Sequence, residues 1–301
     1  MLEFRTDLAM ENLASDLSYP GVEVHRWQES DIELIEVVIL TQEAAQALGK
    51  PCGSYLTLEC SLLREHDPDA RIAMSTLLGE ELGRMLDSGD EAPVLVVGLG
   101  NRSVTPDALG PAVIDKTLVT RHIQGSSFAA KNMRSVCAMA PGVLGVTGIE
   151  TVELVESLVR DLKPRAVVCI DSLAARDSRR IGCTIQVSNT GIQPGSGVGN
   201  HRKPLTRETL GVDVIAVGVP TVIYAATLAR DAFALLSDAE NHEEALNALE
   251  KDLLDTSLGN LIVTPRDIDA IVKNCAVLIS AAVNRALQPR LSEAEIAAMM
   301  D

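Results

Sequence analysis

Apolar residues along this chain fall into short buried runs, separated by longer segments in which they recur with helical periodicity. Runs without alternation, typical of strands buried on both faces, lie at 94–98, 136–139 and 166–170. Further strands are expected at 31–40, 55–60, 181–187 and 213–218. Helices are expected at 41–48, 68–87, 107–118, 148–162, 220–236 and 264–287, with Pro220 opening the fifth. This order predicts an α/β fold with three layers, a mostly parallel sheet and helices on both faces.

The most informative local feature is a strand that leads through a glycine turn into a helix start carrying an acid. Strand 94–98 runs into Gly98-Leu99-Gly100-Asn101, and Thr105-Pro106-Asp107 follows. Glycines permit the tight turn, and we expect Thr105 to be the N-cap with Pro106 at the first helical position. Asp107 then lies where an α/β sheet places its functional groups. A purely local role as a first-turn acid is the alternative.

A second acid, Asp171, directly follows the predicted strand 166–170. Its alternative interpretation is the N-cap of a helix. If the strands before Asp107 and Asp171 are neighbours, the two carboxyls share one crevice, and one of them holds a proton. Such a pair supplies a general acid and a general base. The spacing alone does not establish that the two acids meet.

Composition narrows the function classes. The 301 residues are 47% apolar and 2% aromatic, so aliphatic side chains fill the core of one large or two small domains. The formal charge of −16 argues against direct nucleic-acid binding and fits a cytoplasmic protein. No apolar stretch is expected to be long enough for a membrane helix, and the first residues form no signal peptide. Cysteines and histidines show no metal-ligand spacing, and Ser103 replaces the third glycine of a dinucleotide turn, so neither metal nor cofactor is predicted. A divalent ion held by the two carboxylates is the alternative. His201, after the glycine-rich loop 189–200, is the one histidine that we consider further.

The chain resembles the germination protease of endospore-forming bacteria, from about Arg5 to Leu287. The similar motifs lie at 95–101, 104–111, 118–122, 141–151, 170–176, 189–200 and 217–222. The resemblance implies an endopeptidase that degrades small, acid-soluble spore proteins during germination in the spore core. It also implies a fold like that of hydrogenase-maturation peptidases, a homotetramer, and an aspartic-type mechanism in which Asp107 and Asp171 are catalytic.

The resemblance further implies a self-processing zymogen. The sequence Thr6-Asp7-Leu8-Ala9-Met10-Glu11 is similar to the family's substrate sequences, in which cleavage follows an acid. We therefore expect cleavage between Asp7 and Leu8, which gives one peptidase domain over 1–301 with a short propeptide, 1–7. The local alternative is a helix start capped by Thr6.

Two departures from the family keep other functions open. Tyr224 occupies a position where an acid is expected, and 238–255 is an acidic helix pair shorter than the family's insertion. The alternatives are a maturation-type peptidase that clips a metal-loaded partner and a catalytically inactive scaffold.

Overall fold

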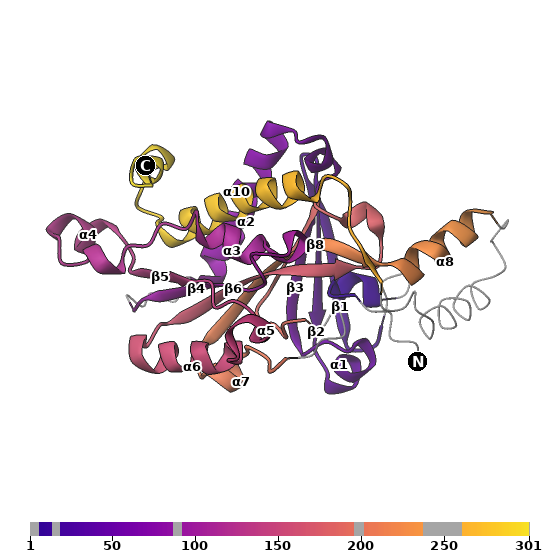
Figure 1. Cartoon of the computed structure of the whole chain (residues 1–301), viewed down its shortest axis with the longest axis horizontal. Coiled ribbons are helices and arrows are strands. Elements are labelled where there is room, and N and C mark those ends of the chain that lie inside the picture. The colour runs from indigo at the N-terminus through magenta and orange to yellow at the C-terminus, as the bar shows by residue number, and fades with distance from the viewer. Residues whose placement is uncertain (1–5, 14–18, 87–91, 196–201, 237–260, 301) are drawn as a thin grey trace.

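The computed structural model describes residues 6–13, 19–86, 92–195, 202–236 and 261–300. Its centre is one sheet with the strand order β1-β2-β3-β7-β8-β6-β4-β5, and β9 pairs with β8 (Figure 1). The strands are β1 (Val22–Glu29), β2 (Ile32–Ile39), β3 (Gly53–Glu59), β4 (Val94–Gly98), β5 (Val136–Met139), β6 (Ala166–Ala175), β7 (Thr184–Ser188), β8 (Asp213–Tyr224) and β9 (Ile262–Val263).

The sheet is mixed. Strands β5, β4, β6 and β8 pair in parallel, whereas β1, β2, β3 and β7 pair antiparallel, as do β7 and β8. Only Ser30 and Asp31 separate β1 from β2, and so short a connection permits antiparallel pairing alone. The predicted α/β class is confirmed, but the sheet is mixed rather than mostly parallel, because parallel pairing is confined to the half that contains β4 and β6.

Helices cover both faces of the sheet, as expected. The α-helices are α1 (Gln42–Leu48), α2 (Pro68–Leu86), α3 (Leu109–Ile114), α4 (Ser127–Asn132), α5 (Leu144–Thr147), α6 (Thr151–Leu162), α7 (Arg207–Leu210), α8 (Ala225–Leu236), α10 (Ile268–Leu287) and α11 (Glu293–Ala298). Short 3-10 helices are η1 (Ala9–Asn12), η2 (Ser61–Glu65), η3 (Thr105–Asp107), η4 (Arg121–Ile123) and η5 (Ser178–Arg180). Helices α2, α3 and α10 lie on one face, and α1, α6 and α7 lie on the other (Figure 1).

Helix α10 corrects one expectation. Within the described ranges it is a helix of 20 residues whose mean hydropathy of 1.4 would suit a membrane span, so the expectation that no stretch is long enough is wrong. However, 61% of the apolar stretch of α10 is buried inside the molecule, where the helix packs against α2 and α3. That environment is typical of a core helix.

Two strands extend further than the sequence pattern predicted. Strand β6 continues through Asp171 to Ala175, and β8 continues through Pro220 to Tyr224. The helix expected to open at Pro220 instead begins at Ala225 as α8. Proline is accommodated because the β6–β8 register shifts there, between Leu173 and Ala174, and irregularities of this kind are where strands tolerate proline.

The alternation of β6 determines where its acid points. Val168 and Ile170 belong to the apolar cluster beneath α2 and α10, whereas Cys169 belongs to the cluster under α6. Leu173 belongs to a third cluster, which includes residues of α1. Because alternate side chains share a face, Asp171 points away from α10, between the second and third clusters.

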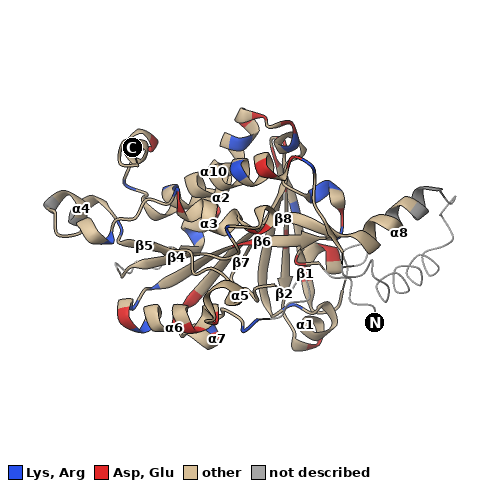
Figure 2. Cartoon of the chain, in the orientation of Figure 1, with Lys and Arg blue, Asp and Glu red and all other residues tan. Residues whose placement is uncertain are grey.

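Most of the ribbon of the central strands is free of charged residues, which gather on outer elements such as α6 (Figure 2). Within β4 to β8, the charged residues are Asp171 and the exposed Asp213 at the start of β8. A carboxyl in the interior of an apolar sheet costs desolvation energy, so Asp171 stands out as a functional candidate.

Candidate active site

Glycines of the predicted turn bring Asp107 against the sheet. Gly100 has φ of +110°, and a Cβ there would lie 2.0 Å from the carbonyl oxygen of Asp107. A Cβ on Gly110 would lie 2.2 Å from the carbonyl oxygen of Leu99 and 2.6 Å from that of Ile170. Only residues without side chains permit these approaches. The Gly98–Gly110 segment therefore packs directly on the end of β4 and on its neighbour β6.

The helix start differs in detail from the prediction. Val104, not Thr105, is the N-cap residue; Thr105 and Pro106 lie inside the short helix η3, and α3 follows from Leu109 to Ile114. The Asp107 carboxylate turns back to the glycine turn, where its Oδ2 accepts a hydrogen bond of 2.8 Å from the N–H of Asn101. The turn rather than the helix start thus holds this carboxylate.

Asp171 lies inside β6 at the point where β4 ends. The last pair between the two strands is Gly98 with Ile170, and the N–H of Leu99 closes the ladder on the Ile170 carbonyl at 2.8 Å. Asp171 is 6% exposed, and its Oδ1 accepts from the N–H of Ser172 at 2.8 Å. The predicted strand end at Asp171 and the alternative of a helix N-cap are both wrong, because β6 continues past it.

The structure brings the two acids into one electrostatic environment. Burial raises the pKa of Asp171 well above its usual value, and the negative charges of Asp107 and Asp7 act in the same direction against one N–H bond from Ser172. Burial also raises the pKa of Asp107, opposed by the N–H of Asn101. The site therefore favours a proton on Asp171, while Asp107 is the acid with the more exposed side chain.

The chain's own N-terminal segment, Thr6–Asn12, occupies the edge of β6 that β4 leaves uncovered. The N–H of Asp7 donates to the carbonyl of Ala174 at 2.9 Å, and the N–H of Ala174 donates to Oδ2 of Asp7 at 2.9 Å. Leu8 is fully buried. An extended segment that bonds the main chain of a strand edge is a common mode of peptide recognition.

The carbonyl oxygen of Asp7 accepts two side-chain hydrogen bonds. Lys50 Nζ donates to it at 2.9 Å and Gln186 Nε2 at 3.0 Å. The other end of the Gln186 amide, Oε1, accepts from the N–H of Ala9 at 2.7 Å. The peptide groups on both sides of Leu8 are thus held by Gln186 of β7 and by Lys50, which follows the C-cap residue of α1.

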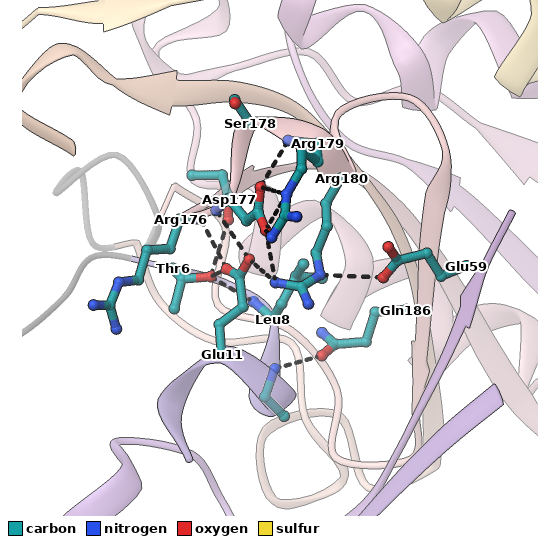
Figure 3. Close-up of polar contacts among 12 residues, drawn as sticks. Thr6, Leu8, Glu11, Glu59, Arg176, Asp177, Ser178, Arg179, Arg180 and Gln186 are labelled. Atoms are coloured by element: carbon teal, nitrogen blue, oxygen red, sulfur yellow. Dashed lines mark hydrogen bonds and ion pairs between the residues drawn. The ribbon is translucent and has the colours of Figure 1, made fainter. Parts of the chain in front are cut away.

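Glu11 anchors the far end of the segment (Figure 3). Its side chain is 2% exposed and pairs with Arg180 at 2.7 Å. The N–H groups of Arg176 and Asp177 donate to its carboxylate at 2.7 and 3.1 Å, and the hydroxyl of Thr6 donates to it as well. Thr6 does not cap the following helix, since η1 begins after Leu8 and has no side-chain cap.

Sequence reasoning missed Lys50, Gln186 and Arg180 as parts of this site. Gln186 carried a signal, because it has a long polar side chain in a strand that is buried throughout. Tyr224, the departure from the family, is buried at the end of β8 and pairs with Ile262 of β9. His201 and the expected helix pair 238–255 lie outside the described residues.

Metal-ligand groups and cavities are two further kinds of candidate site. Among the residues that the structure describes, no group of three or more His, Cys, Asp or Glu could hold a metal ion. A cavity of about 300 Å³ lies between η2, η5 and α10, lined by residues such as His66, Ile181 and Asn274, and contains none of the acids above.

Comparison with known proteins identifies close similarity over nearly the whole chain. A family model described as germination protease matches residues 5–242. The chain is 43% identical to a germination protease of Caldanaerobacter subterraneus subsp. tengcongensis, over 98% of each chain. It is 42% identical to one of Clostridium perfringens over 97% of each chain, and 36% identical to that of Bacillus subtilis over 96% of this chain and 94% of the relative. Among solved structures, it is similar to the [NiFe] hydrogenase maturation protease HycI of Thermococcus kodakarensis, with 16% identity, a TM-score of 0.32, and coverage of 65% of this chain and 94% of that one.

Proposed function

Because this chain belongs to the germination protease family and is a peptidase, we propose that it is a self-processing endopeptidase that starts the breakdown of small, acid-soluble spore proteins during germination. The observation that carries this proposal is the segment Thr6–Glu11, bound at the edge of β6 with the charge of Asp7 acting on Asp171. The zymogen then holds its own N-terminus as a first substrate, with 1–7 as propeptide and the rest of 1–301 as one peptidase domain.

The contacts of the segment support a substrate-like role. Its main chain is bonded at Asp7 and Ala9, and its acid at Glu11 is fixed by an arginine and two N–H groups. The side chain of Asp7 lies near enough to Asp171 to raise the pKa of that acid. We therefore expect the enzyme to recognise two acids in a protein substrate as well. One is the residue before the cleaved bond, as Asp7 is here, and the other lies four positions after it, as Glu11 does.

The two candidate catalytic acids suit different roles. Asp107 takes a proton from water, whose oxygen attacks the carbonyl carbon of Asp7. Asp171, which the site favours in its protonated form, donates its proton to the nitrogen of Leu8 as the C–N bond breaks. The products are a new carboxylic acid at the main-chain carbonyl of Asp7 and a neutral amine at Leu8, which become a carboxylate and an ammonium when the acid's proton passes to the amine. Transfer of the proton from Asp107 to Asp171 then restores the starting state of the pair.

Self-cleavage of the purified full-length chain tests the proposal. We expect mass spectrometry to detect a new N-terminus at Leu8, and expect Asp107→Asn and Asp171→Asn to abolish it. Asp69→Asn, which changes an exposed acid at the start of α2, is the matched control and should cleave normally. An intact chain under all conditions, or normal cleavage in both site variants, would contradict the proposal.

A second assay addresses the protein substrate and the alternatives. The processed chain should cut a purified small, acid-soluble spore protein after an acidic residue, in the presence of chelator. Cleavage that requires a metal-loaded partner would instead indicate a maturation-type peptidase, and binding without cleavage would indicate a scaffold. We also propose, from family membership, a homotetramer located in the spore core, without direct nucleic-acid or membrane binding. Analytical ultracentrifugation tests the assembly, and spore fractionation tests the location.

A further inference from the structure

Lys50 and Gln186 share an unusual property. In the part of the chain that the structure describes, the hydrogen bonds of the Lys50 ammonium and of the Gln186 side-chain amide all go to the N-terminal segment. Three main-chain contacts result: two to the carbonyl oxygen of Asp7 and one to the N–H of Ala9. Buried polar groups are costly unless they are hydrogen-bonded, and Gln186 is buried, so the peptide that the two side chains hold explains their position.

We propose that Lys50 and Gln186 form the oxyanion site of this peptidase, binding the carbonyl oxygen of the bond to be cleaved as it becomes negatively charged. This inference rests on the proposed function, since it takes Asp7–Leu8 as the cleaved bond. Both donors already lie 2.9 and 3.0 Å from that oxygen in the uncleaved chain. A donor that is in place before reaction needs no reorganisation when charge develops.

The strand register places Gln186 on the same face of the sheet as Asp171. Gly218 of β8 pairs with Asp171 of β6 on one side and with Gln186 of β7 on the other. Residues that pair across neighbouring strands point to the same face of the sheet, so Asp171 and Gln186 share a face. Because β8 lies between their strands, β6 and β7 are about 10 Å apart. A carbonyl held at Gln186 therefore lies on the same face of the sheet as the acid proposed to protonate the leaving nitrogen.

The two donors have complementary chemistry. Burial lowers the pKa of the Lys50 ammonium, and the negative charges of Asp7 and Glu11 act against that shift. A cationic donor gains most from an oxygen that turns from neutral to anionic. Gln186 provides a neutral donor and, through its own oxygen, fixes the next peptide group. All three contacts are to main-chain atoms, so they are independent of the side chains of the peptide. Sequence preference then comes from the acids at Asp7 and Glu11 and from the fully buried Leu8, which packs in an apolar cluster.

The proposed reaction is an ordinary hydrolysis in which the negative charge develops on the carbonyl oxygen of Asp7. Water oxygen bonds to the carbonyl carbon, the carbonyl π electrons move to the oxygen between Lys50 and Gln186, and Asp107 receives the water proton. When the carbonyl re-forms, the C–N bond breaks and Asp171 protonates the leaving nitrogen. No other reactant is needed.

Self-cleavage rates of the full-length chain test the inference. Lys50→Met removes the ammonium, Lys50→Arg keeps a cationic donor, and Gln186→Glu keeps the acceptor for Ala9 but removes the donor to the Asp7 carbonyl. Loss of one oxyanion donor lowers a rate constant by about 10²–10³. We expect a loss of this size for Lys50→Met and Gln186→Glu, with partial activity in Lys50→Arg. Lys273→Met, on the exposed surface of α10, is the control and should cleave at the parent rate.

Hydrogen exchange separates catalysis from docking. The N–H groups of Arg176 and Asp177 bond to Glu11 and not to the proposed donors, so their protection reports whether the segment is still bound. Slow cleavage with protection retained supports an oxyanion site. Slow cleavage with protection lost means that Lys50 and Gln186 only hold the segment, and overturns the inference.

The remaining outcomes distinguish the inference from the function on which it rests. Parent-like cleavage in Lys50→Met and Gln186→Glu, together with no cleavage in Asp171→Asn, overturns the oxyanion site and leaves the two-acid peptidase standing. If the parent chain does not cleave, or Asp171→Asn cleaves normally, the proposed function fails and the inference fails with it. If Lys50→Met does not fold, Gln186→Glu and Lys50→Arg give the same decision.

Discussion

Replacing Glu11 with glutamine should release the N-terminal segment from the candidate active site. The substitution keeps the volume of the side chain and removes its charge. The carboxylate accepts from Arg180, from the N–H groups of Arg176 and Asp177, and from the Thr6 hydroxyl. Glutamine has one acceptor oxygen, so in either orientation its NH₂ group faces at least one main-chain N–H.

The expected loss follows from this geometry. The Glu11 side chain is 2% exposed and that of Arg180 is 20% exposed, so the pair is nearly dry. Removing one partner of a buried ion pair costs about 3–5 kcal/mol when the other charge is left without compensation. Arg180 keeps Glu59 at 3.2 Å and Asp177 at 3.9 Å, so the lower end of this range applies. At the lower value of about 3 kcal/mol, the docked state loses a factor on the order of 100 in its equilibrium constant.

Hydrogen exchange measures this equilibrium directly when cleavage is blocked by Asp171→Asn. The N–H groups of Asp7, Ala9 and Ala174 join the segment to the sheet without touching Glu11. Their protection should fall by about 100-fold in Glu11→Gln. Glu43→Gln, on the exposed surface of α1, should leave it unchanged. Protection within threefold of the parent value would refute the buried anchor.

Three further changes have defined outcomes. Gly100→Ala should destabilise the fold by about 1–3 kcal/mol in chemical unfolding and slow cleavage, because φ is +110° and the new Cβ would meet the Asp107 carbonyl; Gly83→Ala, in open space on α2, should not. Asp171→Asn should gain stability relative to the parent as pH rises from about 4, because the folded parent must then ionise a buried acid. The gain should reach about 1.4 kcal/mol for each unit by which the pKa of Asp171 is raised. The same difference in unfolding free energy between variant and parent at pH 4 and pH 8 would contradict this. Asp7→Asn removes a charge that raises the pKa of Asp171, so the alkaline loss of self-cleavage should move to lower pH; an unmoved pH profile would argue against Asp171 as the acid.

The glycine turn could be predicted from sequence because its causes are local. Gly98, Gly100 and Gly110 are required by contacts within a dozen residues, apart from the approaches of Gly98 to Ile114 and of Gly110 to Ile170. The central strands at 94–98 and 136–139 were also predicted with their observed bounds, because their apolar runs are continuous. Local chemistry determined these elements, and the local pattern was sufficient.

The strand ends could not be predicted, because non-local pairing overrides the local signals. Asp171 and Ser172 look like the end of a strand, yet β8 continues to pair with β6 for several residues beyond them. Pro220 looks like a helix start, yet Val222 and Ile223 after it are β-branched and find partners in β6. A polar residue or a proline ends a strand only where no neighbouring strand continues.

The carbonyl-binding residues were missed for a similar reason. Lys50 lies 43 residues from Asp7 along the chain, and Gln186 lies 179 residues from it. Lys50 simply follows Gly49, whose left-handed conformation ends α1, and nothing in that pattern indicates a ligand. The acids could be found because strand ends in α/β folds are known places for function, whereas their partners depend on which strands become neighbours.

Strand register thus connects the fold with the chemistry. Asp171 and Gln186 lie on one face only because each pairs with Gly218, and a slip of one residue in β7 or β6 would turn one of them to the opposite face, beneath α10. The same register leaves the edge of β6 beyond Ile170 uncovered by β4, which is where Asp7 binds. The apolar side chains that alternate with these polar groups pack under α2 and α10, so a slip would bury charge and expose core together. The packing energy of the core therefore also fixes the acid, the amide and the peptide edge relative to one another, without any contact between the two polar side chains.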